Sequence, residues 1–154
     1  MDQAVTFFDL LHTDPNLGPD EAQRRAATEL PAMVQRSAMK WLPTPTHSNG
    51  VGDKLRIGVA VWSGYDLRLL DLVTDAKPSG IAVEVFNMDA AFADGTIEQF
   101  LPGLGSVFHP PVVGHWVGGN LVKTASGYDA RQLVGRVIGF DPKLALERPV
   151  ASNH

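Results

Sequence analysis

The sequence predicts an α/β domain with a mixed sheet and an added helical segment at its N-terminus. From residue 54 onward, short apolar runs alternate with stretches that have the periodicity of a helix. The last two apolar runs are separated only by Gly118-Gly119, which is typical of a tight hairpin turn. The first strands are therefore expected to be parallel, joined by helical crossovers, and the last pair antiparallel.

Length and composition are those of one globular domain. The chain has 154 residues, of which 44% are hydrophobic and 19% are charged. The net charge is −4, and no long run of Lys and Arg is present. Because nucleic-acid-binding proteins usually carry a basic surface, we expect no nucleic-acid partner.

The absence of cysteine limits the chemistry of the protein, and the N-terminal segment bears on its location. Without cysteine the chain cannot form disulfides, iron–sulfur clusters or cysteine-based zinc sites. The first apolar residues are interrupted by Asp9, His12 and Asp14, and no basic segment precedes them. This pattern argues against a signal peptide or a membrane span, so we expect a cytoplasmic protein with no membrane partner. No cofactor is expected either.

Residues 1–42 are predicted to form a helical N-terminal extension. The spacing of an amphipathic helix is followed by Ala4, Phe7, Phe8 and Leu11. A second helix is expected to begin at Pro19 and to continue to about Trp41. Residues 43–53 are rich in Pro, Gly, Ser and Thr and are predicted to be a linker.

The α/β domain itself is predicted over residues 54–140. Its expected elements are a strand at 54–62, a helix at 66–76, a strand at 80–89, a short helix at 94–101, two strands within 110–125 and a closing helix at 128–138. Residues 141–154 have no periodicity and are expected to be a flexible tail.

Three short motifs follow one another in an order known from one protein family. The first strand ends at Trp62, and Ser63-Gly64-Tyr65-Asp66 then opens a helix. Pro111 precedes the next strand, and Gly118-Gly119 forms the turn that follows it. This order resembles the thioredoxin family, which has Trp-Cys-Gly-Pro-Cys, a cis-proline and a hairpin at these places. The resemblance covers about residues 52–140 and implies a three-layer fold, with a central sheet of about four strands and helices on both faces.

The resemblance does not extend to redox chemistry. Ser63 stands at the position of the attacking thiol and Asp66 at the position of the resolving thiol. Disulfide exchange requires a thiolate nucleophile and a sulfur that it can attack. We therefore expect a redox-inactive member of the family.

The tetrapeptide Ser-Gly-Tyr-Asp occurs twice, and both copies have the pattern of a helix N-cap. Ser63 and Ser126 each precede an aspartate by three positions, just before a run with helical periodicity. We predict that each hydroxyl accepts a backbone N–H at the start of its helix. Asp66 and Asp129 would lie at the positive ends of the two helix dipoles.

The resemblance also implies a binding surface around the first copy. In proteins of this fold, the loop with the cis-proline lies beside the start of the first helix. An apolar groove next to a strand edge is then expected from Trp62, Tyr65, Pro110 and Pro111. Extended peptides pair with such an edge without any need for cysteine. We therefore expect a binding or assembly module for a partner protein or an extended peptide.

An enzyme that reuses this location is the alternative. Ser63, Tyr65, Asp66 and His109 carry groups that can act as nucleophile, acid or base when they meet. Asp66 would have to orient His109, and His109 would have to reach Ser63. The sequence leaves open whether the protein is an enzyme.

Two further expectations concern metals and self-association. The five histidines show neither His-x₃-His spacing nor a cluster with carboxylates, so no metal site is predicted. The first helix is strongly apolar, with Phe7, Phe8, Leu10 and Leu11. Residues 1–42 therefore pack on their own sheet, or they join a second copy or another protein.

Overall fold

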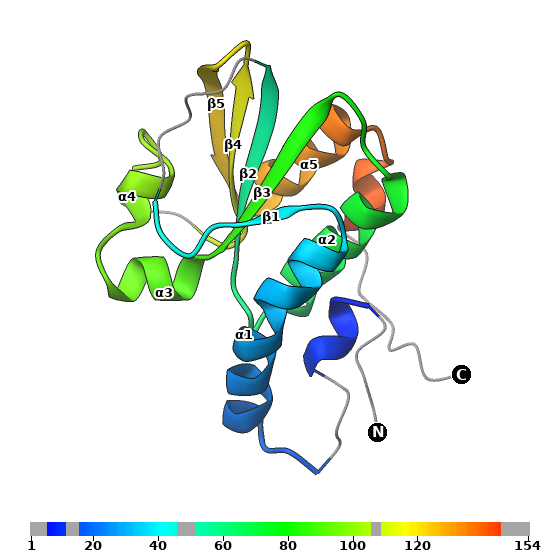
Figure 1. The fold of residues 1–154 in the computed structure, drawn as a ribbon, viewed down its shortest axis with the longest axis vertical. Coiled ribbons are helices and arrows are strands. Elements are labelled where there is room, and N and C mark those ends of the chain that lie inside the picture. Colours follow the sequence, from blue (N-terminus) through cyan, green and yellow to red (C-terminus); the bar gives the residue numbers. More distant parts are fainter. Residues whose placement is uncertain (1–5, 12–15, 46–51, 106–108, 146–154) are drawn as a thin grey trace.

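The computed structural model describes residues 6–11, 16–45, 52–105 and 109–145, and these form an open five-stranded sheet with helices (Figure 1). The strands are β1 (Lys40–Trp41), β2 (Asp53–Val59), β3 (Ile81–Asn87), β4 (Val112–Val117) and β5 (Asn120–Ser126). The α-helices are α1 (Pro19–Arg36), α2 (Gly64–Ala76), α3 (Met88–Ala93), α4 (Ile97–Phe100) and α5 (Gly127–Ile138). Two 3-10 helices are η1 (Phe8–Leu11) and η2 (Pro142–Ala145).

The sheet is mixed, and its strand order is β1-β3-β2-β4-β5. β1 and β2 both run parallel to β3, whereas β4 runs antiparallel to β2 and β5. Helix α2 makes the crossover from β2 to β3 that parallel neighbours require. β4 and β5 are joined at Gly118 and Gly119, both with the positive φ that a two-residue hairpin turn needs. The prediction of a parallel crossover followed by an antiparallel hairpin is therefore confirmed.

The two faces of the sheet carry separate hydrophobic cores. Alternate residues of β2 point to opposite faces, so Leu55 and Ile57 lie on the first face and Arg56 and Gly58 on the second. The first face packs against α1, α2 and α5, and the second packs against α3 and α4 (Figure 1). Position 58 has no room for a side chain, because a Cβ there would collide with the ring of Phe86.

The N-terminal region differs from the prediction in two ways. Helix α1 ends at Arg36 and not near Trp41, because Ala38 adopts a left-handed conformation with φ of 62° that turns the chain away. The residues that follow then pair with β3 as β1, which is the fifth strand that the expected sheet lacked. The first apolar segment forms only the short η1, and Ala4 lies outside the described residues.

Helix α3 is a further element that was not predicted from the sequence. The strand expected over 80–89 ends at Asn87, whose side-chain oxygen accepts the N–H of Asp89 at 3.0 Å and that of Ala90 at 3.4 Å. This side chain caps a new helix. Of the expected linker, residues 46–51 lie outside the described ranges, as do residues 146–154 of the expected tail.

The N-terminal segment is docked on its own domain by Asp71 of α2. The backbone N–H groups of Phe7 and Phe8 donate to its two carboxylate oxygens at 2.7 and 3.0 Å. Phe7 and Leu10 are buried in the first core. Burial raises the pKa of Asp71 to about 6, while the two N–H groups act in the opposite direction. The described part of this segment therefore packs on its own sheet.

We expect Asp71→Ala to lower the free energy of unfolding by about 1–3 kcal/mol, because two backbone donors lose their acceptor. Hydrogen exchange at the amides of Phe7 and Phe8 should accelerate at the same time. Asp75→Ala is the matched control, since Asp75 is exposed on the same helix, and it should change neither quantity. Unchanged exchange at Phe7 in Asp71→Ala would mean that the carboxylate does not hold the segment.

Candidate functional site

The first Ser-Gly-Tyr-Asp copy begins helix α2, and the cap predicted there is confirmed. Ser63 is the N-cap residue, and its Oγ accepts the backbone N–H of Asp66 at 3.3 Å. The same hydroxyl donates to Oδ1 of Asp66 at 3.2 Å. The ring of Phe8 covers Gly64, because a Cβ added there would lie 2.9 Å from it. The N-terminal segment therefore lies directly against this motif.

Asp66 is fully buried at the point where strand β2 gives way to helix α2. Its Oδ2 accepts the N–H of Ala60 at 2.8 Å, and its Oδ1 accepts the hydroxyl of Ser63. Burial raises the pKa of Asp66 to about 7, although the bonds from Ala60 and Ser63 and the charge of Arg131 lower it. This carboxyl therefore ties the strand end to the helix start, and it changes protonation near neutral pH.

The second copy begins helix α5 without the predicted cap. Ser126 occupies the N-cap position, but its side chain makes no capping hydrogen bond. Gly127 has a positive φ of 59°, and its N–H donates to the carbonyls of His109 at 2.9 Å and Pro111 at 2.8 Å. Asp129 is exposed. The cap predicted for Ser126 is wrong, because the chain enters this helix through a left-handed glycine whose amide binds the preceding loop.

The loop before β4 places the remaining predicted residues. The peptide bond between Pro110 and Pro111 is cis, at the position where the resemblance has a cis-proline. Pro111 is buried and Pro110 is half-buried, whereas His109 is exposed. Among the hydrogen bonds of the described residues, none joins the His109 ring to Ser63 or Asp66. The structure therefore brings Ser63 and Asp66 together but does not bond either one to His109.

Trp62 and Tyr65 have different neighbours, although they are close in sequence. The guanidinium of Arg131 lies 5.1 Å from the ring of Tyr65 and partly covers it. Trp62 is 52% exposed, and its indole N–H donates to Oδ1 of Asp89 at 3.2 Å. The other oxygen of Asp89 accepts the N–H of Val61 at 3.3 Å. Asp89 therefore fixes the position of the exposed indole ring.

Two hollows adjoin Trp62, and both are lined in part by α1. The first, of about 410 Å³, is lined by Asp20, Gln23, Arg24, Val61, Trp62 and Asp89, among others. The second, of about 290 Å³, is lined by Leu11, Leu17, Pro19, Ala22, Gln23 and Trp62. Neither hollow includes Tyr65, Pro110 or Pro111, so the four residues expected to form one groove are not gathered in either.

The contributions of α1 and Asp89 to this surface were not predicted from the sequence. The position of α1 depends on tertiary packing, for which its local sequence carries no signal. Asp89 had a weak signal, since an acidic residue at the end of a predicted strand can meet the backbone of a neighbouring strand end. Its partners, Val61 and Trp62, lie just after the end of β2, more than 25 residues earlier in the chain.

Sequence comparisons identify no family for this chain. No family model matches it, and no curated protein matches it.

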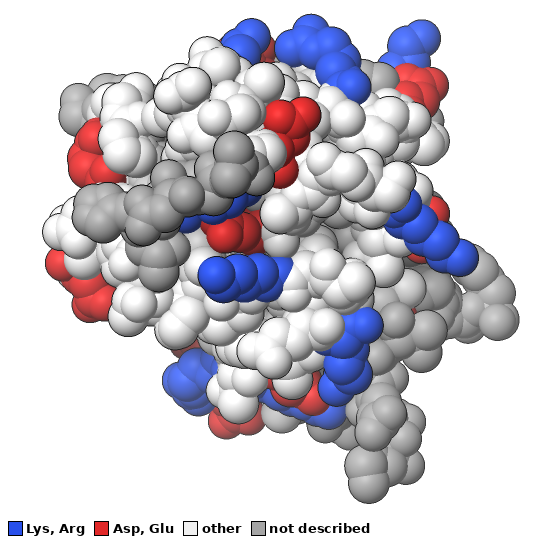
Figure 2. All heavy atoms as spheres, turned by 45° about the horizontal axis from the view of Figure 1, so that its top comes forward, with Lys and Arg blue, Asp and Glu red and all other residues white. Residues whose placement is uncertain are grey.

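In the described part of the chain, no three His, Cys, Asp or Glu side chains are grouped so that they could hold a metal ion. No helix in the described ranges is long and apolar enough to cross a membrane. Figure 2 shows acidic and basic side chains interspersed over one face, so the charge on that face is not gathered into a basic patch.

Proposed function

We propose that the chain is a thioredoxin-like domain that binds a partner protein or an extended peptide and does not exchange disulfides. The strand order, the antiparallel β4–β5 pair and the helix that begins after Ser63 support the likeness. Ser63 and Asp66 stand where the thiols would be, and no cysteine elsewhere can supply a thiolate. The proposed binding site is the Trp62 surface, which consists of the Trp62 ring and the two hollows that adjoin it.

The exposed but fixed ring of Trp62 is the observation that carries this proposal. Tryptophan is enriched among the few residues that supply most of the binding energy of an interface. Because Asp89 already holds the indole N–H, little side-chain freedom remains to be lost when a partner binds. The adjoining hollows offer room for apolar side chains of the partner.

The geometry gives less support to the alternative of an enzyme at this location. Asp66 is buried and bonded to Ala60 and Ser63, so a substrate has no access to its carboxyl. The hydroxyl of Ser63 is used twice within its own cap. A nucleophile also needs a base within hydrogen-bond reach, and His109 is not bonded to Ser63 within the described ranges.

Photo-crosslinking from position 62 tests the proposal. Trp62 is replaced by the photoreactive residue p-benzoylphenylalanine in the full chain, expressed in its source organism. We expect illumination to give a discrete adduct whose second component is identified by mass spectrometry. The matched control carries the same residue at Tyr128, which is 56% exposed and belongs to the second Ser-Gly-Tyr-Asp copy. No adduct at position 62, or the same adduct from both positions, would contradict the proposal.

The purified partner then provides a quantitative check. We expect Trp62→Ala to weaken its binding about thirtyfold, which corresponds to the ~2 kcal/mol typical of an interface hot spot. Tyr128→Ala should leave the affinity unchanged. Calorimetric titration measures both variants against the unmodified chain.

A further inference from the structure

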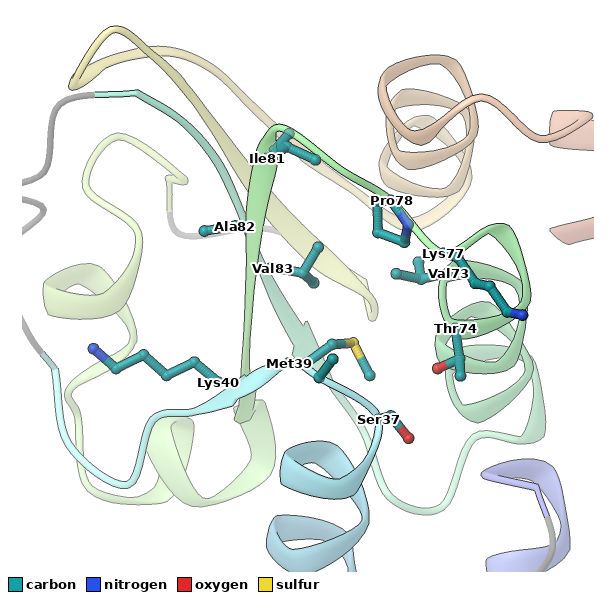
Figure 3. Close-up of a pocket in the computed structure, with 11 residues that line it drawn as sticks. Ser37, Met39, Lys40, Val73, Thr74, Lys77, Pro78, Ile81, Ala82 and Val83 are labelled. Atoms are coloured by element: carbon teal, nitrogen blue, oxygen red, sulfur yellow. The ribbon is translucent and has the colours of Figure 1, made fainter.

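Another hollow, of about 450 Å³, lies at the edge of the sheet (Figure 3). The ends of α1 and α2 and the start of β3 enclose it, and no residue of the Trp62 surface lines it. Its apolar lining includes Met39, Val73, Pro78, Ile81 and Val83. Its volume is in the range of sites that bind ligands.

The edge of β3 is open at this hollow. β1 pairs only with Glu84 and Val85, so in the described part of the chain residues 81–83 have β2 on one side and no strand on the other. The carbonyl of Val85 accepts the N–H of Leu42 at 2.9 Å, so the backbone groups of Val85 face β1. Backbone groups two positions apart face the same edge, so both groups of Ile81 and the N–H of Val83 point out of the sheet, whereas the carbonyl of Val83 faces Lys40 of β1.

The hollow reaches this backbone edge itself, because Ile81, Ala82 and Val83 all line it. Ile81 and Val83 belong to the first core, whereas alternation places the side chain of Ala82 on the second face. A ligand that touches all three residues therefore lies along the edge and not on one face alone.

We propose that an extended peptide of another protein, with alternating apolar and acidic residues, binds here as an additional strand beside residues 81–83. Strand addition supplies partners for the open backbone groups of a sheet edge. The side chains of the added strand point alternately to the two faces. Those on the first face enter the hollow and contact Met39 and Val73, and those on the second face approach Lys40.

Lys40 gives this site its preference for carboxylates on the second face, and Lys77 adds positive charge at the opposite side of the hollow. Lys40 lies on the second face, because the next residue, Trp41, packs against the first core. Figure 3 shows the side chains of Lys40 and Lys77 extending from the hollow in opposite directions. The ion pairs found among the described residues involve neither lysine. Carbonyls at the ends of α1 and α2 already accept N–H groups of Ser37, Met39 and Lys77, which reduces their repulsion of an anion.

A second copy of this chain is a poorer occupant of the edge. Pairing of two such edges would bring Lys40 and Lys77 of one copy towards the same lysines of the other. Like charges opposite each other in a strand pair are destabilising. Glu84 cannot compensate, because it is buried and paired with Lys54 and Arg56.

The test uses the full chain and a fluorescein-labelled hexapeptide of alternating Val and Glu. We expect saturable binding by fluorescence anisotropy, together with slower hydrogen exchange at the amides of Ile81 and Val83, which face the open edge. The corresponding hexapeptide of Val and Lys should not bind. Two further peptides carry N-methyl groups on all Val or on all Glu amides. Only one edge of the added strand faces β3. One of these two peptides should therefore bind at least about tenfold more weakly than the unmethylated Val-Glu peptide, and the other should keep its affinity.

Variants of the protein locate the site. Lys40→Glu should weaken binding of the Val-Glu peptide about fivefold, whereas Lys123→Glu, at an exposed lysine of β5, should not. Trp62→Ala should also leave this affinity unchanged, which separates this site from the Trp62 surface. Absence of binding, or equal affinity for both N-methylated peptides, would overturn the proposal. A dimer of the protein alone that the peptide dissociates would overturn it in favour of self-pairing.

Discussion

Glu84→Ala is expected to lower the free energy of unfolding by about 3–5 kcal/mol, because it leaves a buried cation without its partner. Arg56 is only 1% exposed in the middle of the sheet, and its Nε donates to Oε1 of Glu84 at 3.0 Å. The other oxygen of Glu84 lies 3.3 Å from Nζ of Lys54. Arginine keeps its charge in proteins, so it cannot relieve the cost by releasing a proton. Urea unfolding of the variant and of the unmodified chain measures the loss.

The remaining contacts of Arg56 compensate its charge only in part. Its Nη1 donates to the carbonyl of Phe100 in α4 at 2.9 Å, and the guanidinium lies 5.0 Å from the ring of Trp116. Its Nη2 lies 3.0 Å from Oε1 of Glu84, but the geometry of this contact is not that of a hydrogen bond. Because the same side chain anchors α4, we also expect hydrogen exchange in α4 to accelerate in Glu84→Ala.

Two variants control this prediction. Glu29→Ala removes a half-exposed ion pair with Arg25 within α1 and should cost about 0.5 kcal/mol or less. The double variant Arg56→Met with Glu84→Met replaces the charged pair with apolar side chains and should recover most of the loss. If Glu84→Ala cost no more than Glu29→Ala, the carboxylate would not be compensating a buried charge.

Much of the sheet could be predicted because its signals are local. The β4–β5 hairpin follows from two glycines between apolar runs, and the helix α2 follows from the periodicity after Ser63. The strand β1 has no such signal, since two residues have no periodicity and Lys40 and Trp41 become a strand only when they reach β3. Helix α3 escaped prediction because its apolar residues continue those of β3, and only the cap at Asn87 separates the two elements.

Long-range contacts account for what the sequence could not predict about the site. The cap at Ser63 depends on residues three positions apart and was predictable, whereas the amide of Gly127 is bound by a loop about 17 residues away. Likewise, the burial of Arg56 depends on Glu84, which is 28 residues away in sequence. The Trp62 surface requires α1 to lie beside the end of β2, and this follows only from the packing of the first core.

We expect the stability of the protein to fall as the pH rises from about 5 to 8, with Asp66 as a principal cause. Burial raises the pKa of Asp66 from the ordinary value of 3.8 to about 7. In this range the folded state holds a proton that the unfolded state has released, so the linkage favours the folded state at lower pH. The contribution of Asp66 to the free energy of unfolding is complete below about pH 4 and is lost as the pH rises through 7. One unit of pKa difference corresponds to about 1.4 kcal/mol, so the total is about 4 kcal/mol.

Asp66→Asn isolates this contribution, because the amide resembles the protonated acid and can still accept the N–H of Ala60. We expect this variant to be more stable than the unmodified chain at pH 8, by urea unfolding at each pH, and we expect the difference to narrow as the pH falls and to vanish below about pH 4. Some pH dependence should remain in the variant, since the pKa of Asp71 is also raised, to about 6. Asp129→Asn, at the exposed aspartate of the second Ser-Gly-Tyr-Asp copy, should leave the pH profile unchanged. Parallel profiles for Asp66→Asn and the unmodified chain would assign the pH dependence to other groups.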